Sequence, residues 1–238
     1  VIPDFQISVN AGFRFFIKKQ VGMCLLREAA HAWQQLTGTE YRITVGRRGK
    51  KSSFALSFSF ADFPHVAGMQ YAQDVDFGLR PSEYYGERLI PSILSGKLEA
   101  ANMERSLNWL RIKGRLNAII HLQETLDTEF LIARFRPNLV RIHCKIDAEY
   151  IIKNLHSGEV FFVFIDKGTG QRYYCKSAFE RTTIDYLENQ AVLTVLKKEK
   201  VMNGIPTLLY LHPNYMEDAL PIYRFQYAAV TCGTTLPV

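Results

Sequence analysis

The spacing of apolar residues changes along the chain from a helical period to an alternating one. Apolar side chains recur at helical spacing over residues 20–36 and predict a helix that stops at Thr37-Gly38, where glycine commonly ends helices. Residues 41–45 and 54–60 then alternate between apolar and polar positions, with a basic turn at 46–51 between them. This pattern predicts a β-hairpin with one buried face and a cationic tip.

Helical signals precede a long series of strand signals. Asp62, followed by Phe63-Pro64, predicts the start of a short helix that carries His65 and ends near Gly68. Residues 99–126 form the longest helical segment, with its apolar side chains near one face. Strands are predicted at 130–135, 140–144, 160–165, 173–179, 191–197 and 208–211. Helices followed by strands indicate an α+β fold.

Composition narrows the class of protein. The 238 residues are 47% hydrophobic and 13% aromatic, as in a globular protein, and no apolar run approaches the roughly 20 residues of a membrane helix. We therefore expect a soluble protein. The net charge of +6 and pI of about 9.1 suit either a polyanionic partner or an ordinary solvated surface.

Cysteine, histidine and glycine patterns give no sign of a metal or cofactor. The four cysteines lie far apart without C-x-x-C, which favours free thiols and a cytoplasmic location. No histidine lies in an H-x-x-x-H or H-E-x-x-H pattern, so we expect chemistry without a metal ion and without any cofactor. Serine-hydrolase, P-loop and dinucleotide-binding glycine motifs do not occur in the sequence.

Several short motifs, in this order, resemble one family of nucleases. They are Phe63–Tyr71, Arg115 ahead of Leu122–Asp127, Asp147–Asn154, Tyr173–Phe179, Asp185-Tyr186, Asn189-Gln190 and Leu193–Lys198. Together they resemble the fourth family of phage-associated Barnase, EndoU, colicin and RelE-like nuclease domains (PBECR-type), which are RNase toxins or effectors of phages, prophages and bacterial mobile elements. The resemblance covers about residues 25–211 and departs from the family pattern at Ala178.

The resemblance implies a fold and an activity. We expect one domain over residues 1–215, a curved antiparallel sheet packed against the long helix with an N-terminal helix and hairpin, and an extension at 216–238. The implied activity is a metal-independent endoribonuclease, in which the 2′-hydroxyl attacks the neighbouring phosphate while side chains act as base, acid and cation. RNA is the expected partner, an immunity or antitoxin protein is a second candidate, and no membrane partner is expected.

Three residues are candidates for catalysis. His65 suits acid or base chemistry because an imidazole titrates near neutrality, although it could equally fill the space between hairpin and helix. Arg115 belongs to the family pattern and could stabilise the phosphate, with ordinary solvated helix charge as the alternative. Ser177 is either a hydroxyl aimed at phosphate or a buried polar group satisfied by the backbone.

Four further residues are candidates for substrate binding. Arg111 lies one helical turn before Arg115 and could complete a phosphate clamp. Lys176 neighbours Ser177, so strand alternation sends the two to opposite faces unless the strand bulges or ends there. The remaining candidates are Tyr186, as a phenol donor or as packing, and Lys198, as part of a basic surface that tracks RNA or is merely solvated. The alternative function is an inactive nucleic-acid-binding or protein-interaction module with the same fold.

Overall fold

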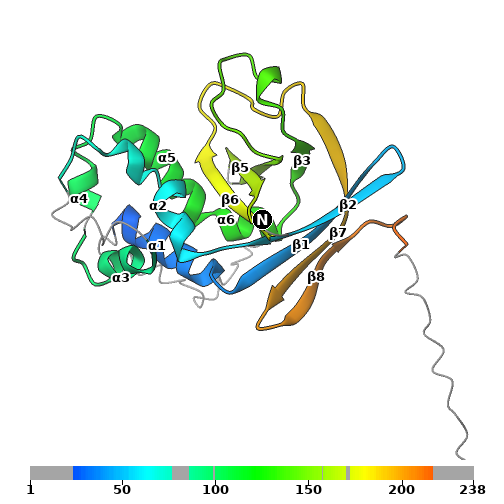
Figure 1. Cartoon of the computed structure of the whole chain (residues 1–238), viewed down its shortest axis with the longest axis horizontal. Coiled ribbons are helices and arrows are strands. Elements are labelled where there is room, and N and C mark those ends of the chain that lie inside the picture. The colour runs from blue at the N-terminus through cyan, green and yellow to red at the C-terminus, as the bar shows by residue number, and fades with distance from the viewer. Residues whose placement is uncertain (1–23, 77–85, 99, 157, 170–171, 217–238) are drawn as a thin grey trace, which may run out of the picture.

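The computed structural model describes residues 24–76, 86–98, 100–156, 158–169 and 172–216. A closed barrel of strands stands beside a group of helices (Figure 1). The extension expected at 216–238 lies outside the described residues except for Met216, as do residues 20–23 of the first predicted helix. None of the helices in the described ranges is long and apolar enough to cross a membrane.

The first helix and the hairpin form as the apolar pattern predicts. Helix α1 (Leu25–Leu36) buries five side chains at helical spacing, and Trp33 at its centre donates an indole hydrogen bond to the carbonyl of Ser59 at 3.0 Å. Strands β1 (Thr39–Arg47) and β2 (Lys50–Ser57) pair in antiparallel register. Their two-residue turn, Arg48-Gly49, has positive φ at both positions, the geometry that matches the twist of a tight hairpin.

The sheet closes on itself, so the expected curved sheet packed on a long helix is wrong. The other strands are β3 (Leu131–Arg134), β4 (Tyr150–His156), β5 (Glu159–Lys167), β6 (Arg172–Glu180), β7 (Ala191–Met202) and β8 (Ile205–Leu211). Seven of them form a ring in the order β1-β2-β6-β5-β4-β3-β7, because β7 pairs with β1. The β2–β6 pair is parallel, so the barrel is mixed, and β8 pairs with the C-terminal half of β7, from Lys197 to Met202.

The predicted helix over 99–126 is broken into three: α4 (Ala100–Met103), α5 (Trp109–Ile120) and α6 (Leu122–Asp127). The first break has a clear cause. The carboxylate of Asp74 accepts hydrogen bonds of 2.7 Å from both the hydroxyl of Ser106 and the backbone N–H of Leu107, which holds a turn ahead of α5. Leu107 and Leu110, counted as apolar-face residues in sequence, are consequently exposed.

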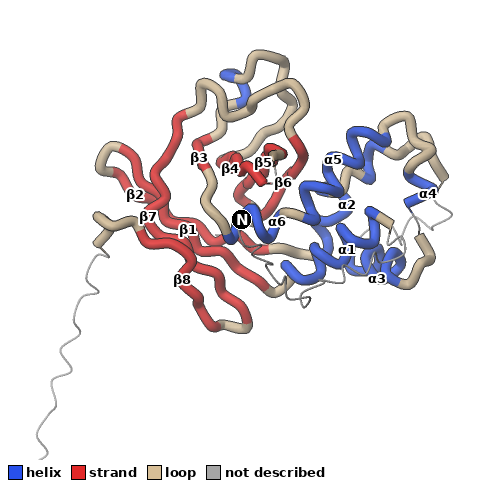
Figure 2. The backbone as a smooth tube through the Cα atoms, turned by 180° about the vertical axis from the view of Figure 1, so that it is seen from behind, coloured by secondary structure: helices blue, strands red, loops and turns tan. Residues whose placement is uncertain are grey.

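The remaining helices gather on the same side of the barrel as α1 and α5 (Figure 2). These are α2 (Phe63–Val66) and α3 (Leu89–Leu94), with short 3₁₀ helices at Phe60–Asp62, Met69–Tyr71 and Gly86–Arg88; a further 3₁₀ helix, Pro137–Leu139, lies apart from them in the segment between β3 and β4. Alternate residues of β5 serve two cores: Val163 belongs to the cluster shared by barrel interior and helices, whereas Phe162 and Phe164 belong to a second cluster outside the barrel.

A loop covers this second cluster. The strand predicted at 140–144 does not form, and residues 141–146 instead run as an irregular segment between Pro137–Leu139 and β4. Its apolar side chains Val140, Cys144 and Ile146 pack against the outward-facing Phe162 and Phe164. The alternation that predicts a strand here therefore reflects one-sided burial of a loop.

Candidate active site

A cavity of about 810 Å³ opens between α5, α2, β6 and the loop at 142–146. Six of the seven residues predicted to form the site line it: His65, Arg111, Arg115, Lys176, Ser177 and Tyr186. They come from two helices, a strand and a loop that are far apart in sequence, namely α2, α5, β6 and the segment after β6. The structure thus brings them together, while their chemical roles stay predictions.

Arg115 is the buried cation of the cavity. Its side chain is 4% exposed, which overturns the alternative of a solvated helix charge. Its Nη1 donates to the hydroxyl of Ser177 at 2.9 Å and to the carbonyl of Val66 at 3.3 Å. Among the described residues no carboxylate pairs with it, and its buried Nε has no hydrogen-bond partner. Burial lowers the pKa of Arg115, yet a guanidinium stays protonated at neutral pH.

Tyr71 and Arg111 complete the cationic wall. The guanidinium of Arg111 lies 3.7 Å from the ring centroid of Tyr71, and that of Arg115 lies 5.0 Å from the same ring. The aromatic face therefore holds two like charges in one place, which suits an anion with several oxygens. Arg111 is exposed, so it can move onto a ligand while Arg115 stays fixed.

The motif around His65 fits closely against Arg115. Phe63 is buried in the core, and Pro64 occupies the first turn of α2. Gly68 ends this segment with a φ of +81°, and a Cβ placed there would lie 2.7 Å from Cδ of Arg115. Glycine is required here for both the left-handed backbone and the contact.

His65 presents its imidazole to the cavity in a neutral state. Partial burial lowers its pKa below the ordinary 6.5, and the nearby charges of Arg115 and Lys176 lower it further. The imidazole makes no hydrogen bond to the residues that the structure describes, so its nitrogens are available to a substrate. A neutral, accessible imidazole is suited to accept a proton.

A bulge in β6 lets two consecutive residues line the cavity. Phe164 pairs with Ser177 and Ile165 pairs with Cys175, so Lys176 is an extra residue on β6. This irregularity is the condition under which Lys176 and Ser177 can share one site. Lys176 forms an ion pair of 2.6 Å with Asp166; burial acts to lower its pKa, but Asp166 raises it overall.

Tyr186 serves packing as well as the cavity wall. Its ring contacts Phe162, Phe164 and Phe179 edge-on with centroids 5.4 to 5.5 Å apart. Burial raises its pKa, so the phenol keeps its proton and can donate a hydrogen bond. Both interpretations offered by the sequence are compatible with this position.

Lys198, predicted to bind substrate, lies outside the cavity. It is 3% exposed, and its Nζ donates to the carbonyls of Leu126 at 2.8 Å and Asp127 at 3.3 Å. Burial lowers its pKa to about 8. Lys198 therefore caps the end of α6. The basic hairpin tip also lies away from the cavity, on the side of the barrel opposite the helices (Figure 1).

The sequence analysis missed several titratable residues of the cavity, and Glu180 and His143 are the two that could act as acid or base. Glu180, at the end of β6, has a buried Oε1 without a hydrogen-bond partner among the described residues, and burial raises its pKa. His143 lies on the loop at 142–146, in the segment mistaken for a strand. A signal for Glu180 existed, because it lies four residues after Lys176 on β6, a spacing that places both on one face of a regular strand, but no pattern pointed to His143.

The charge of the cavity is strongly positive. Its lining includes five lysines and arginines, namely Arg111, Arg115, Lys145, Lys176 and Arg181, against one carboxylate, Glu180. Such an excess of fixed cations concentrates anionic ligands and orients phosphate groups. The site therefore combines a buried anion-binding guanidinium with a neutral imidazole and a protonatable carboxyl.

The family model described as phage-Barnase-EndoU-ColicinE5/D-RelE like nuclease4 matches residues 25–210. The match spans α1 through nearly all of β8 and includes all the residues that line the cavity. No curated protein and no solved structure matches the chain.

Proposed function

The chain belongs to the phage-Barnase-EndoU-ColicinE5/D-RelE like nuclease4 family and is a nuclease-like domain of phage origin, and we propose that it cleaves RNA in the cavity without a metal ion. The observation that carries this proposal is the buried guanidinium of Arg115, which has no carboxylate partner among the described residues and an orphaned Nε. An uncompensated buried cation is costly unless an anion completes it. A phosphodiester is that anion.

The proposed reaction uses the 2′-hydroxyl of RNA as the nucleophile. Arg115 and the hydroxyl of Ser177 bind the non-bridging phosphate oxygens, and their charge and hydrogen bonds stabilise the phosphorane. Arg111, stacked on Tyr71, adds a second cation from the open side. DNA lacks the 2′-hydroxyl, so the same contacts would bind it without cleaving it.

Proton transfer is assigned to His65 and Glu180. His65 takes the proton of the 2′-hydroxyl as the O2′–P bond forms, because its lowered pKa keeps it neutral. Glu180 protonates the O5′ leaving group as the P–O5′ bond breaks, because burial helps it to hold a proton. The products are a 2′,3′-cyclic phosphate and a 5′-hydroxyl.

The donor set supports a reaction without metal in this cavity. Sites that hold Mg²⁺ for phosphoryl transfer supply carboxylate oxygens, and Glu180 is the one carboxylate among the lining residues. Five lysines and arginines occupy the positions from which cations reach a phosphate. Arginine can perform the charge stabilisation that a metal performs elsewhere.

The test is cleavage of a short RNA in EDTA, compared with a substrate carrying a single 2′-deoxy substitution at the cleavage site. We expect the wild type to cut the RNA and leave a cyclic phosphate, and the deoxy substrate to survive. His65→Ala should lose about 100-fold or more in rate, the usual range for a general base. His31→Ala, which removes an exposed imidazole on α1, is the matched control and should retain full activity. RNA binding without cleavage by the folded wild type would favour a binding module instead.

A further inference from the structure

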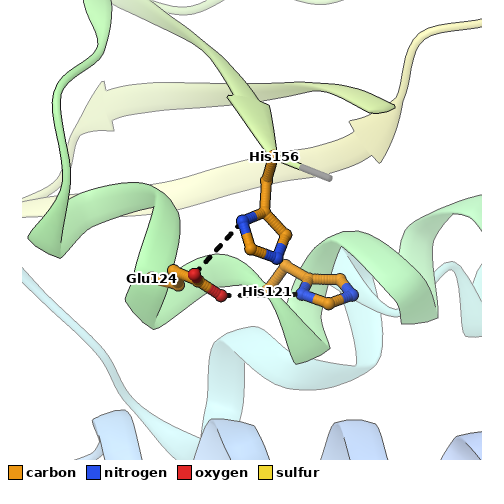
Figure 3. Close-up of side chains that lie close together, drawn as sticks. All are labelled: His121, Glu124 and His156. Atoms are coloured by element: carbon orange, nitrogen blue, oxygen red, sulfur yellow. Dashed lines mark ion pairs between the residues drawn. The ribbon is translucent and has the colours of Figure 1, made fainter. Parts of the chain in front are cut away.

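A second cluster of polar side chains lies outside the cavity, where α6 begins beside the end of β4. It consists of His121, Glu124 and His156, whose nitrogen and carboxylate atoms all lie within 4.8 Å of one another. Figure 3 shows His121 and Glu124 on one helical segment, with His156 approaching from the strand. None of the three lines the cavity, so the proposed nuclease reaction leaves them without a role.

The distances match a site into which an ion could fit. Nδ1 of His156 lies 3.1 Å from one carboxylate oxygen of Glu124, and Nδ1 of His121 lies 4.0 Å from the other. Ligands that bind zinc at about 2.0–2.2 Å lie at such separations from one another after small rotations. The carboxylate is thus shared between two imidazoles instead of being paired with a lysine or arginine of the described chain.

The backbone already holds the two elements in place. The side-chain amide of Asn154, two residues before His156, is buried in β4. It donates to Oγ1 of Thr128 at 3.0 Å and to the carbonyl of Glu129 at 2.7 Å, just after α6. His121 and Glu124 are three residues apart across the first turn of α6 and so share a face. The three ligands therefore come from elements whose relative position is fixed without the ion.

We propose that His121, Glu124 and His156 bind a divalent transition metal ion of the zinc class, with water in the fourth position. Two imidazoles and one carboxylate suit zinc, whereas Mg²⁺ and Ca²⁺ prefer oxygen ligands alone. The side chains are 24% to 50% exposed, which leaves a path for the ion and room for water. The bound ion would link the start of α6 to the end of β4, two elements that the Asn154 hydrogen bonds already hold together.

The first test is binding of Co²⁺ and Zn²⁺ to the full chain after treatment with a chelator. We expect one equivalent of Co²⁺ to produce the visible absorption of a low-coordinate nitrogen and oxygen site, and Zn²⁺ to displace it. Glu124→Gln and His156→Ala should each lower the affinity by at least about tenfold, since even changes to surrounding residues cost about 10–100-fold in metal sites. His31→Ala should bind as the wild type does.

The second test separates a metal site from a simple histidine–glutamate ion pair. Metal binding needs neutral imidazoles, so the rise in melting temperature caused by Zn²⁺ should grow as the pH increases from about 5.5 to about 7.5. An ion pair without a metal site would give no rise in melting temperature with Zn²⁺ at either pH. Absence of a Co²⁺ band, or equal loss of binding in His31→Ala, would overturn the proposal. Because the readouts are spectroscopic and thermal, they are independent of whether RNA is cut.

Discussion

Replacing Arg115 with methionine separates its effect on the stability of the fold from its contribution to anion binding in the cavity. Arg115 donates to Val66 and Ser177, bonds that contribute about 1.5–3 kcal/mol each for a charged donor. Against them stand several kcal/mol for desolvating the ion and about 1–3 kcal/mol for the orphaned Nε. Methionine fills a similar volume. We therefore expect Arg115→Met to change the free energy of unfolding by no more than about 1.5 kcal/mol, in either direction.

The assay is urea unfolding with and without a phosphate oligoanion such as pyrophosphate. At a concentration of 100 times its Kd the anion should stabilise the wild type by about 2.7 kcal/mol and leave Arg115→Met unaffected. Arg172→Met is the matched control, because Arg172 pairs with Asp62 at 2.8 Å and its loss should lower stability without removing anion binding. A loss of more than about 3 kcal/mol in Arg115→Met would refute the reasoning, because that is the cost of breaking a compensated buried charge.

Three other predictions concern the same region. Gly68→Ala should lower unfolding free energy by about 1–3 kcal/mol and reduce cleavage, because a left-handed φ and a 2.7 Å clash act together; Gly38→Ala, where φ is +90° and the space is open, should cost less and leave cleavage intact. The rate of RNA cleavage should peak on the acid side of neutrality, because the pKa of His65 is lowered from 6.5 and that of Glu180 is raised from 4.5. Glu180→Gln removes the proposed acid and should abolish the alkaline limb of the pH–rate profile. A peak above pH 8 would contradict the assignment. Lys198→Met should lower thermal stability, because it uncaps α6, yet leave RNA affinity unchanged in a filter-binding assay.

The sequence predicts local elements better than their assembly. Helix α1 and the hairpin depend on nearby residues, namely the apolar spacing before Gly38 and the Arg48-Gly49 turn, and both appear as expected. Barrel closure depends on the pairing of β1 with β7, which lie more than 140 residues apart in the sequence. The local spacing of apolar residues cannot predict such a pairing. The first break in the predicted long helix likewise depends on Asp74, which lies over 30 residues away.

The site shows the same division. Residue type and the ordered motifs point to His65, Arg115 and Ser177, and the structure brings the three to one cavity. Burial decides what the sequence left open: it makes Arg115 an interior cation, and it turns Lys198 into a helix cap. Glu180 gains its interest only from desolvation, which depends on how α5 lies over β6 and is invisible in the order of residues.

Neighbouring strands of the barrel differ in how many residues they pair. Among the residues that the structure describes, β2 and β6 pair at two positions, Ala55 with Arg172 and Leu56 with Tyr173, whereas β1 and β2 pair along their whole length. Amide protons at this seam should consequently exchange with solvent sooner than those elsewhere in the barrel. Because β6 also carries Lys176 and Ser177, we expect local opening of the β2–β6 pairing to displace these two residues of the cavity lining. On heating, we therefore expect the domain to lose its activity at a lower temperature than the one at which it unfolds.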